Sequence, residues 1–322
     1  MITLPFFKTP QRFQYFFICT FLVCFCLCVS TLYAAEPVAE KVIEEAVGEG
    51  EYQPPTVEEL WQKATKYLND GDREQAAQYF YTVFKRFPKD DNAAASLWNT
   101  ALIRRDFALA TKEADWEHIG NLFRLYSNYF PNGAAAADAY LEIGKTYYFM
   151  GLYREAVSYF KLFLNKYPHS ALIEECKRWL GKAYTKVGKI KEAKEIFQVL
   201  VDDKDAAVKR LGLLSMGDLH FSEQEYREAK DYYQMIVINY PNYYLGDPDI
   251  LRKAGIANIR YGKLLRGRNQ LYHYLNLVTA KLHRLEVLFE LGDSYLTEND
   301  SASAMKLYQQ VLEEGEQGDK EV

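Results

Sequence analysis

Few residues in this sequence have types and spacings that could support catalysis or metal binding. The five histidines are scattered, and none has a second histidine at the i, i+4 spacing that places two imidazoles on one helix face. No phosphate-binding glycine loop, nucleophile elbow or zinc-finger spacing occurs. Acidic pairs such as Glu174 with Glu175 fall at expected helix starts, where capping and solvation explain them. We therefore predict a protein that is not an enzyme and that uses neither a cofactor nor a metal ion.

The cysteines give little support to redox chemistry. Four of the five lie in one apolar stretch near the N-terminus, which leaves Cys176 alone in the rest of the chain. A single cysteine cannot form an internal disulfide. We expect Cys176 to be a small packing residue on a helix, with pairing to a partner protein or a reactive thiol as the alternatives.

The elements that position the remaining side chains are recognised from a repeated pattern. Residues 137–200 contain the same arrangement twice, with a shift of 37 residues. Small residues at two positions let helix backbones approach, aromatic residues fill the space around them, and a further glycine falls where the chain must turn. In the first copy these residues are Gly144, Tyr147, Gly151, Ala156 and Phe160, and in the second Gly181, Tyr184, Gly188, Ala193 and Phe197. Each copy predicts two helices joined by a tight turn.

Further copies are expected on both sides. The copy nearest the N-terminus begins at the capping-box pair Thr56 and Glu59, and the next spans residues 92–133, with extra length around 108–114. After the two central copies, two more span residues 210–243 and 248–281, and the last begins near residue 285. The extra length is interpreted as a tolerated insertion, with a functional loop as the alternative. His220 stands at an aromatic position and is expected to be packed. Gly267 is expected to weaken its helix.

These residues resemble the tetratricopeptide repeat, a helix pair of 34 residues defined by small and large residues in alternation. The resemblance implies an all-α fold, a right-handed α-solenoid of about seven helical hairpins over residues 57–314. A polar tail, 315–322, follows. The sequence of residues 159–170 is also similar to that of tetratricopeptide proteins of the bacterial envelope, including those that assist outer-membrane assembly.

In this family the first helix of each pair lines a concave groove, so the resemblance places groove residues by their position in the repeat. The predicted partner-binding residues are Trp61, Lys145, Tyr148, Arg178, Lys182, Lys186, Phe221, Arg252 and Arg260. Six of them are basic and make a stripe inside a protein of formal net charge −5. The alternative is a solvated helix face without a ligand.

The N-terminus has the outline of an export signal. Residues 13–33 carry no charge and are followed by Ala34 and Ala35, so residues 1–35 are expected to be a cleaved signal peptide or an uncleaved membrane anchor. Residues 36–56 form an acidic linker that is too poor in large apolar residues to fold alone. Both alternatives place the repeats outside the cytoplasm, in the periplasm or at the cell envelope, with membrane association through the N-terminal segment.

Two functions fit these observations. The first is an exported scaffold that binds proteins or extended peptides, including acidic ones, in envelope assembly. The second is a periplasmic module for peptidoglycan or another polymer, whose tyrosines stack on sugars. Nucleic acid is not an expected partner, because acidic residues outnumber basic ones by 44 to 39.

Overall fold

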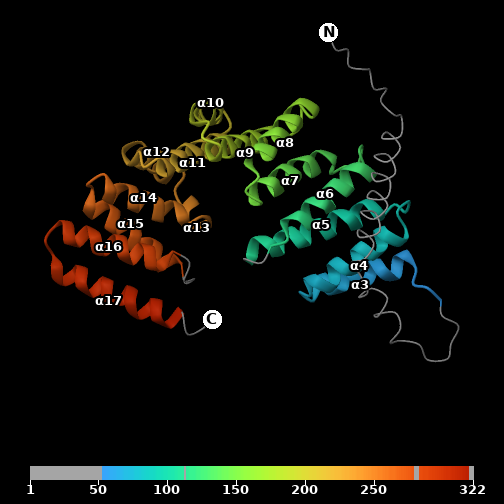
Figure 1. Ribbon diagram of the computed structural model, residues 1–322, viewed down its shortest axis with the longest axis horizontal. Coiled ribbons are helices and arrows are strands. Elements are labelled where there is room, and N and C mark those ends of the chain that lie inside the picture. The colour runs from blue at the N-terminus through green and yellow to red at the C-terminus, as the bar shows by residue number, and fades with distance from the viewer. Residues whose placement is uncertain (1–52, 112–113, 279–282, 319–322) are drawn as a thin grey trace, which may run out of the picture. The chain divides into compact units, whose positions relative to one another are not determined.

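The computed structural model describes residues 53–111, 114–278 and 283–318 (Figure 1). These residues form seven helical hairpins and no β-strand. The first helices of the hairpins are α3 (Val57–Asn69), α5 (Ala93–Ala110), α7 (Ala136–Phe149), α9 (Ile173–Lys186), α11 (Ala206–Ser222), α14 (Asp249–Arg260) and α16 (Arg284–Thr297). The second helices are α4 (Arg73–Arg86), α6 (Trp116–Tyr129), α8 (Tyr153–Lys166), α10 (Ile190–Val201), α12 (Tyr226–Asn239), α15 (Leu264–Leu277) and α17 (Ser301–Gly318). The predicted all-α solenoid is confirmed, and a single short helix, α13 (Tyr243–Gly246), precedes α14.

The third to seventh hairpins are each closed by a glycine of the first helix that faces a large residue of the second. A Cβ atom at Gly144 would lie 2.5 Å from Cε1 of Phe160, and one at Gly217 would lie 2.7 Å from Cε1 of Tyr233. Real Cβ atoms do not approach other atoms this closely, so only glycine lets these helices reach the observed separation. The small and large positions inferred from the sequence are therefore the contacts that hold each hairpin together.

The turns inside the third to seventh hairpins share one backbone geometry. Gly151 and Gly188 have φ of +77°, and in both turns the next residue donates its N–H to a carbonyl five residues earlier, as Leu152 does to Tyr147. Two turns reach the same conformation without glycine, through Gln224 with φ of +60° and Asn299 with φ of +62°. A side chain at positive φ carries a steric cost that glycine avoids.

The second and sixth hairpins correct two expectations. The extra residues near 108–114 do not all lie in a connection, because α5 continues to Ala110 and Ala108 is buried against Ile119 and its neighbours. Gly267 does more than weaken α15. A Cβ atom there would lie 2.6 Å from the carbonyl oxygen of Gly255, so this glycine permits the close contact of α14 with α15.

Among the described residues, the apolar core consists of four clusters, each of which spans neighbouring hairpins. One cluster joins Leu141 of α7, Phe160 of α8, Leu180 of α9 and Phe197 of α10. Cys176 lies inside it with its Sγ 3.4 Å from the carbonyl oxygen of Phe160, and burial raises the pKa of its thiol to about 12. This is the packing role expected for Cys176.

The chain ends are only partly within the described residues. The predicted signal or anchor at 1–35 and almost all of the linker at 36–56 lie outside them. The helices begin at Val57 and continue to Gly318, past the predicted end at 314. None of the helices in the described part of the chain has the length and apolar character needed to cross a membrane.

Candidate partner-binding surface

The predicted binding residues come from first helices, and these helices contact one another along the stack. α9 touches both α7 and α11, and α14 touches α16. Side chains of successive first helices therefore lie next to one another on the surface that these helices form. We call this the first-helix surface, and it includes Lys145, Arg178, Lys182, Arg252 and Arg260.

Three of its basic residues form ion pairs with acidic residues. In each case at least one acidic partner lies on the following first helix. Lys145 Nζ lies 2.6 Å from Glu175, Arg252 Nη1 lies 2.7 Å from Glu286, and Arg260 contacts both carboxylate oxygens of Glu290 at 2.5 and 3.1 Å. These contacts link α7 to α9 and α14 to α16. Their positive charges are therefore largely neutralised within the protein.

The three basic residues of α9 differ from these. Within the described ranges, Arg178, Lys182 and Lys186 form no ion pair. The Nε atom of Arg178 is buried and has no hydrogen-bond partner there. Lys182 is half-buried and Lys186 is exposed. A buried donor without an acceptor is unfavourable, so these side chains would gain from an anion that approached α9.

Trp179 contacts one of these cations, Lys182, and also Lys145 of α7. Its ring lies 4.9 Å from Nζ of Lys182 and 5.7 Å from Nζ of Lys145, and both distances are within the range of a cation–π contact. Tyr148 of α7 packs edge-on against the same ring, with centroids 5.3 Å apart. Lys145, Tyr148 and Lys182 were predicted for this site, but Trp179 was not. The sequence signal that could have identified Trp179 is its position next to Arg178 in α9.

The electrostatic environment of Lys182 is unfavourable for its charge. Burial, together with the nearby positive charge of Arg178, lowers the pKa of its ammonium group to about 8, and the negative charge of Asp218 opposes this shift. Asp218 is itself engaged, since it accepts hydrogen bonds from Lys253 at 2.8 Å and from the Tyr233 hydroxyl at 2.9 Å. The protein thus lacks a carboxylate dedicated to Lys182 among its described residues.

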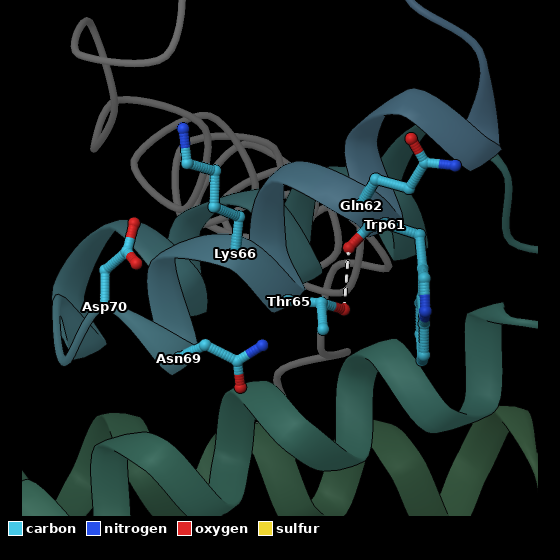
Figure 2. A pocket seen from close by; sticks show the side chains of 6 residues that line it. All are labelled: Trp61, Gln62, Thr65, Lys66, Asn69 and Asp70. Carbon is cyan, nitrogen blue, oxygen red and sulfur yellow. Dashed lines mark hydrogen bonds between the residues drawn. The ribbon is translucent and has the colours of Figure 1, made fainter.

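The two remaining predicted residues lie apart from α9. Phe221 packs against Tyr226 and Tyr233, so it contributes to the core between hairpins. Trp61 packs edge-on against Phe80 of α4 and lines a pocket of about 510 Å³ on α3 (Figure 2). The other residues of this pocket are Gln62, Thr65, Lys66, Asn69 and Asp70. The structure does not bring Trp61 together with the α9 cations through any contact.

The described residues contain no group of three or more histidine, cysteine, aspartate or glutamate side chains arranged to hold a metal ion. His220 is packed as expected. Its ring stacks on Tyr232 with centroids 5.4 Å apart, and Nδ1 lies 2.5 Å from the Glu225 carboxylate.

Comparison with known families agrees with the repeat geometry. A tetratricopeptide repeat model matches residues 138–170, 212–243 and 286–314, which correspond to the third, fifth and seventh hairpins. The chain carries tetratricopeptide repeats. The family model thus confirms the resemblance, and tetratricopeptide repeats serve as scaffolds for protein–protein interaction.

Two solved structures share this fold, with TM-scores above 0.5. A tetratricopeptide repeat protein from Parabacteroides merdae aligns with a TM-score of 0.58 and 14% identity over 80% of this chain and 92% of its own. The APC/C hetero-tetramer Cut9–Hcn1 aligns with a TM-score of 0.56 and 14% identity over 77% of this chain and 44% of that one. MamA from Desulfovibrio magneticus covers 56% of this chain and 95% of its own, with 19% identity and a TM-score of 0.45. Among curated protein sequences, none matches.

Proposed function

We propose that the protein is an exported, non-catalytic scaffold of the bacterial cell envelope. In this proposal the repeats hold an acidic or C-terminal segment of a partner protein against α9. The observation that carries the proposal is the set of basic side chains on α9 that have no ion pair in the described part of the chain, with Lys182 over the ring of Trp179.

The chemistry of this set favours an anionic ligand. A carboxylate near Lys182 would offset the desolvation that lowers its pKa, and it could accept the unused Nε–H of Arg178. The apolar faces of Trp179 and Tyr148 would contact the rest of an extended peptide. Since the neighbouring basic residues already have carboxylate partners, a ligand's negative charge is directed to α9.

Binding of peptides is tested by calorimetry with the purified protein. The titrants are an acidic peptide ending in a free carboxylate, the same peptide with amidated side chains and C-terminus, and peptidoglycan fragments. The proposal expects binding of the acidic peptide, weaker binding at high salt and little binding of the amidated form. Binding of the glycan alone would favour the polymer-binding alternative and contradict the peptide proposal.

Export and envelope localisation rest on the sequence of residues 13–35. N-terminal sequencing of the protein from fractionated cells is the direct test. The proposal expects recovery from the envelope or periplasmic fraction. Recovery from the cytosol with Met1 intact would contradict it.

A further inference from the structure

The last hairpin leaves uncovered two positions that the other second helices bury or half-bury. The residue eleven positions after the start of a second helix is Leu164 in α8, Val237 in α12 and Leu275 in α15. Each is half-buried against a cluster that includes the next first helix. The equivalent residue of α17 is Leu312, and it is 68% exposed. Met305 of α17 is 69% exposed, although its equivalent Val157 in α8 is half-buried.

The first helix of this hairpin adds two further apolar side chains. Phe289 stands three residues before the small residue Gly292, as the buried Leu141 stands before Gly144. Leu296 is the equivalent of Tyr148, which packs against Trp179 of the next hairpin. Phe289 is 48% exposed and Leu296 is 50% exposed. We call Phe289, Leu296, Met305 and Leu312 the terminal face, and its two helices lie in contact (Figure 1).

The opposite end of the stack does not complement this face. In α3, exposed charged residues occupy the positions at which later first helices bury small or apolar side chains against the preceding hairpin. They are Glu59, Lys63 and Lys66, where α9 buries Cys176, Leu180 and Ala183. Head-to-tail stacking of two copies would place these charges against Met305 and Leu312, and the loss of their hydration would oppose it.

The terminal face is, in contrast, complementary to itself. Lys306 and Glu313 directly follow Met305 and Leu312 in α17, and both are exposed. If two α17 helices pack antiparallel about a two-fold axis, Met305 of one copy meets Leu312 of the other. Lys306 then lies about 3 Å along the helix axis from Glu313 of the other copy, within reach of the two long side chains, at both ends of the contact. Lys306 has no ion pair within the described residues, so it is available for this interaction.

We propose that the terminal face binds the same face of a second copy of this chain, giving a two-fold symmetric dimer through α16 and α17. The contact buries four apolar side chains from each copy and adds two symmetry-related ion pairs. Isologous contacts of this kind close at two subunits and form no filament. The proposal is independent of the α9 site, because it involves neither Arg178 nor Lys182.

The test is the mass of the purified protein, measured by light scattering over a range of concentrations. The wild type is expected to form the dimer, and Leu312→Glu is expected to raise the dissociation constant of the dimer at least tenfold. Leu265→Glu is the matched control, because Leu265 of α15 is 67% exposed but lies outside the terminal face. It should leave the dissociation constant unchanged.

A charge exchange keeps the test valid if Leu312→Glu misfolds. Lys306→Glu and Glu313→Lys should each weaken the dimer, and the double variant should restore it, since both pairs are re-formed with exchanged signs. A wild type that stays monomeric at all concentrations would overturn the proposal, whether or not another protein binds the face. A dimer that tolerates Leu312→Glu, or a double variant without recovery, would overturn it as well.

Discussion

Lys145 of α7 and Lys182 of α9 lie over the same indole ring, with their Nζ atoms 5.7 and 4.9 Å from the centroid of Trp179. They differ in their partners. Lys145 contacts the carboxylates of Glu142 and Glu175, whereas Lys182 has no carboxylate at ion-pair distance in the described chain. One of two adjacent ammonium groups therefore has its charge compensated and the other does not. This difference is the basis of the binding proposal.

Removing the charge of Lys182 should stabilise the folded protein. Its pKa is lowered to about 8 from the ordinary 10.5, so at neutral pH the folded state pays for a charge that the unfolded chain hydrates freely. Lys182→Met should raise the free energy of unfolding at pH 7 by on the order of 1–3 kcal/mol. Denaturant unfolding measures this change in the free energy of unfolding, and Lys161→Met, at an exposed position, is the control.

The same shift predicts a pH dependence. Between about pH 8 and 10.5 the unfolded chain retains a proton on Lys182 that the folded protein has lost, so this group makes the wild type more stable as the pH rises. The stability difference between wild type and Lys182→Met should shrink across this interval. A constant difference from pH 7 to 10.5 would show that Lys182 is not buried as described.

The small positions should respond to a single methyl group with opposite signs according to their surroundings. At Gly144 the added Cβ would overlap the Phe160 ring, so Gly144→Ala should cost roughly 1–3 kcal/mol. At Gly315 in α17 no atom lies within 4 Å, and the higher helix propensity of alanine should add up to about 1 kcal/mol. Thermal unfolding of both variants decides this. Equal midpoints would contradict the register of the first helices.

The turn at Gln224 offers a second stability test. Its φ of +60° is the conformation that Gly151 and Gly188 adopt at the same position of other hairpins. Gln224→Gly should therefore relieve backbone strain and stabilise the fold by about 1 kcal/mol. Gly188→Ala is the reverse change and should destabilise by a similar amount. A loss of stability in Gln224→Gly would mean that the side chain contributes more than the strain costs.

The hairpins could be predicted from the sequence because their determinants are local. Gly144 and Phe160 lie in one hairpin, and the turn glycines Gly151 and Gly188 each join the two helices of their own hairpin, so spacing along the chain reports these contacts. The pairing of Arg252 with Glu286 could not be found in this way, because the two residues belong to different hairpins and meet only after stacking.

Some features of the structure could not be predicted because the residues at those positions differ from the repeat pattern. Gln224 and Asn299 adopt a turn conformation that the sequence signals only when glycine is present. The extension of α5 depends on the burial of Ala108 against Ile119, a contact between helices that alanine spacing does not reveal. Trp179 was not predicted because in the sequence it resembles any other aromatic residue of a helix. Its role is visible only in the structure, where Lys145 of α7 lies over its ring.

The central claim is that the cations of α9 bind an anionic partner segment, and charge reversal tests it most directly. Arg178→Glu with Lys182→Glu is compared with Lys161→Glu and Lys191→Glu, which change the net charge equally at exposed positions outside the first-helix surface. Binding of the acidic peptide is measured at low and high salt, with circular dichroism on each protein. The account predicts that the α9 double variant keeps its helicity but loses at least tenfold in affinity, while the control retains salt-sensitive binding. Equal affinities for the two double variants, or binding insensitive to salt, would contradict it.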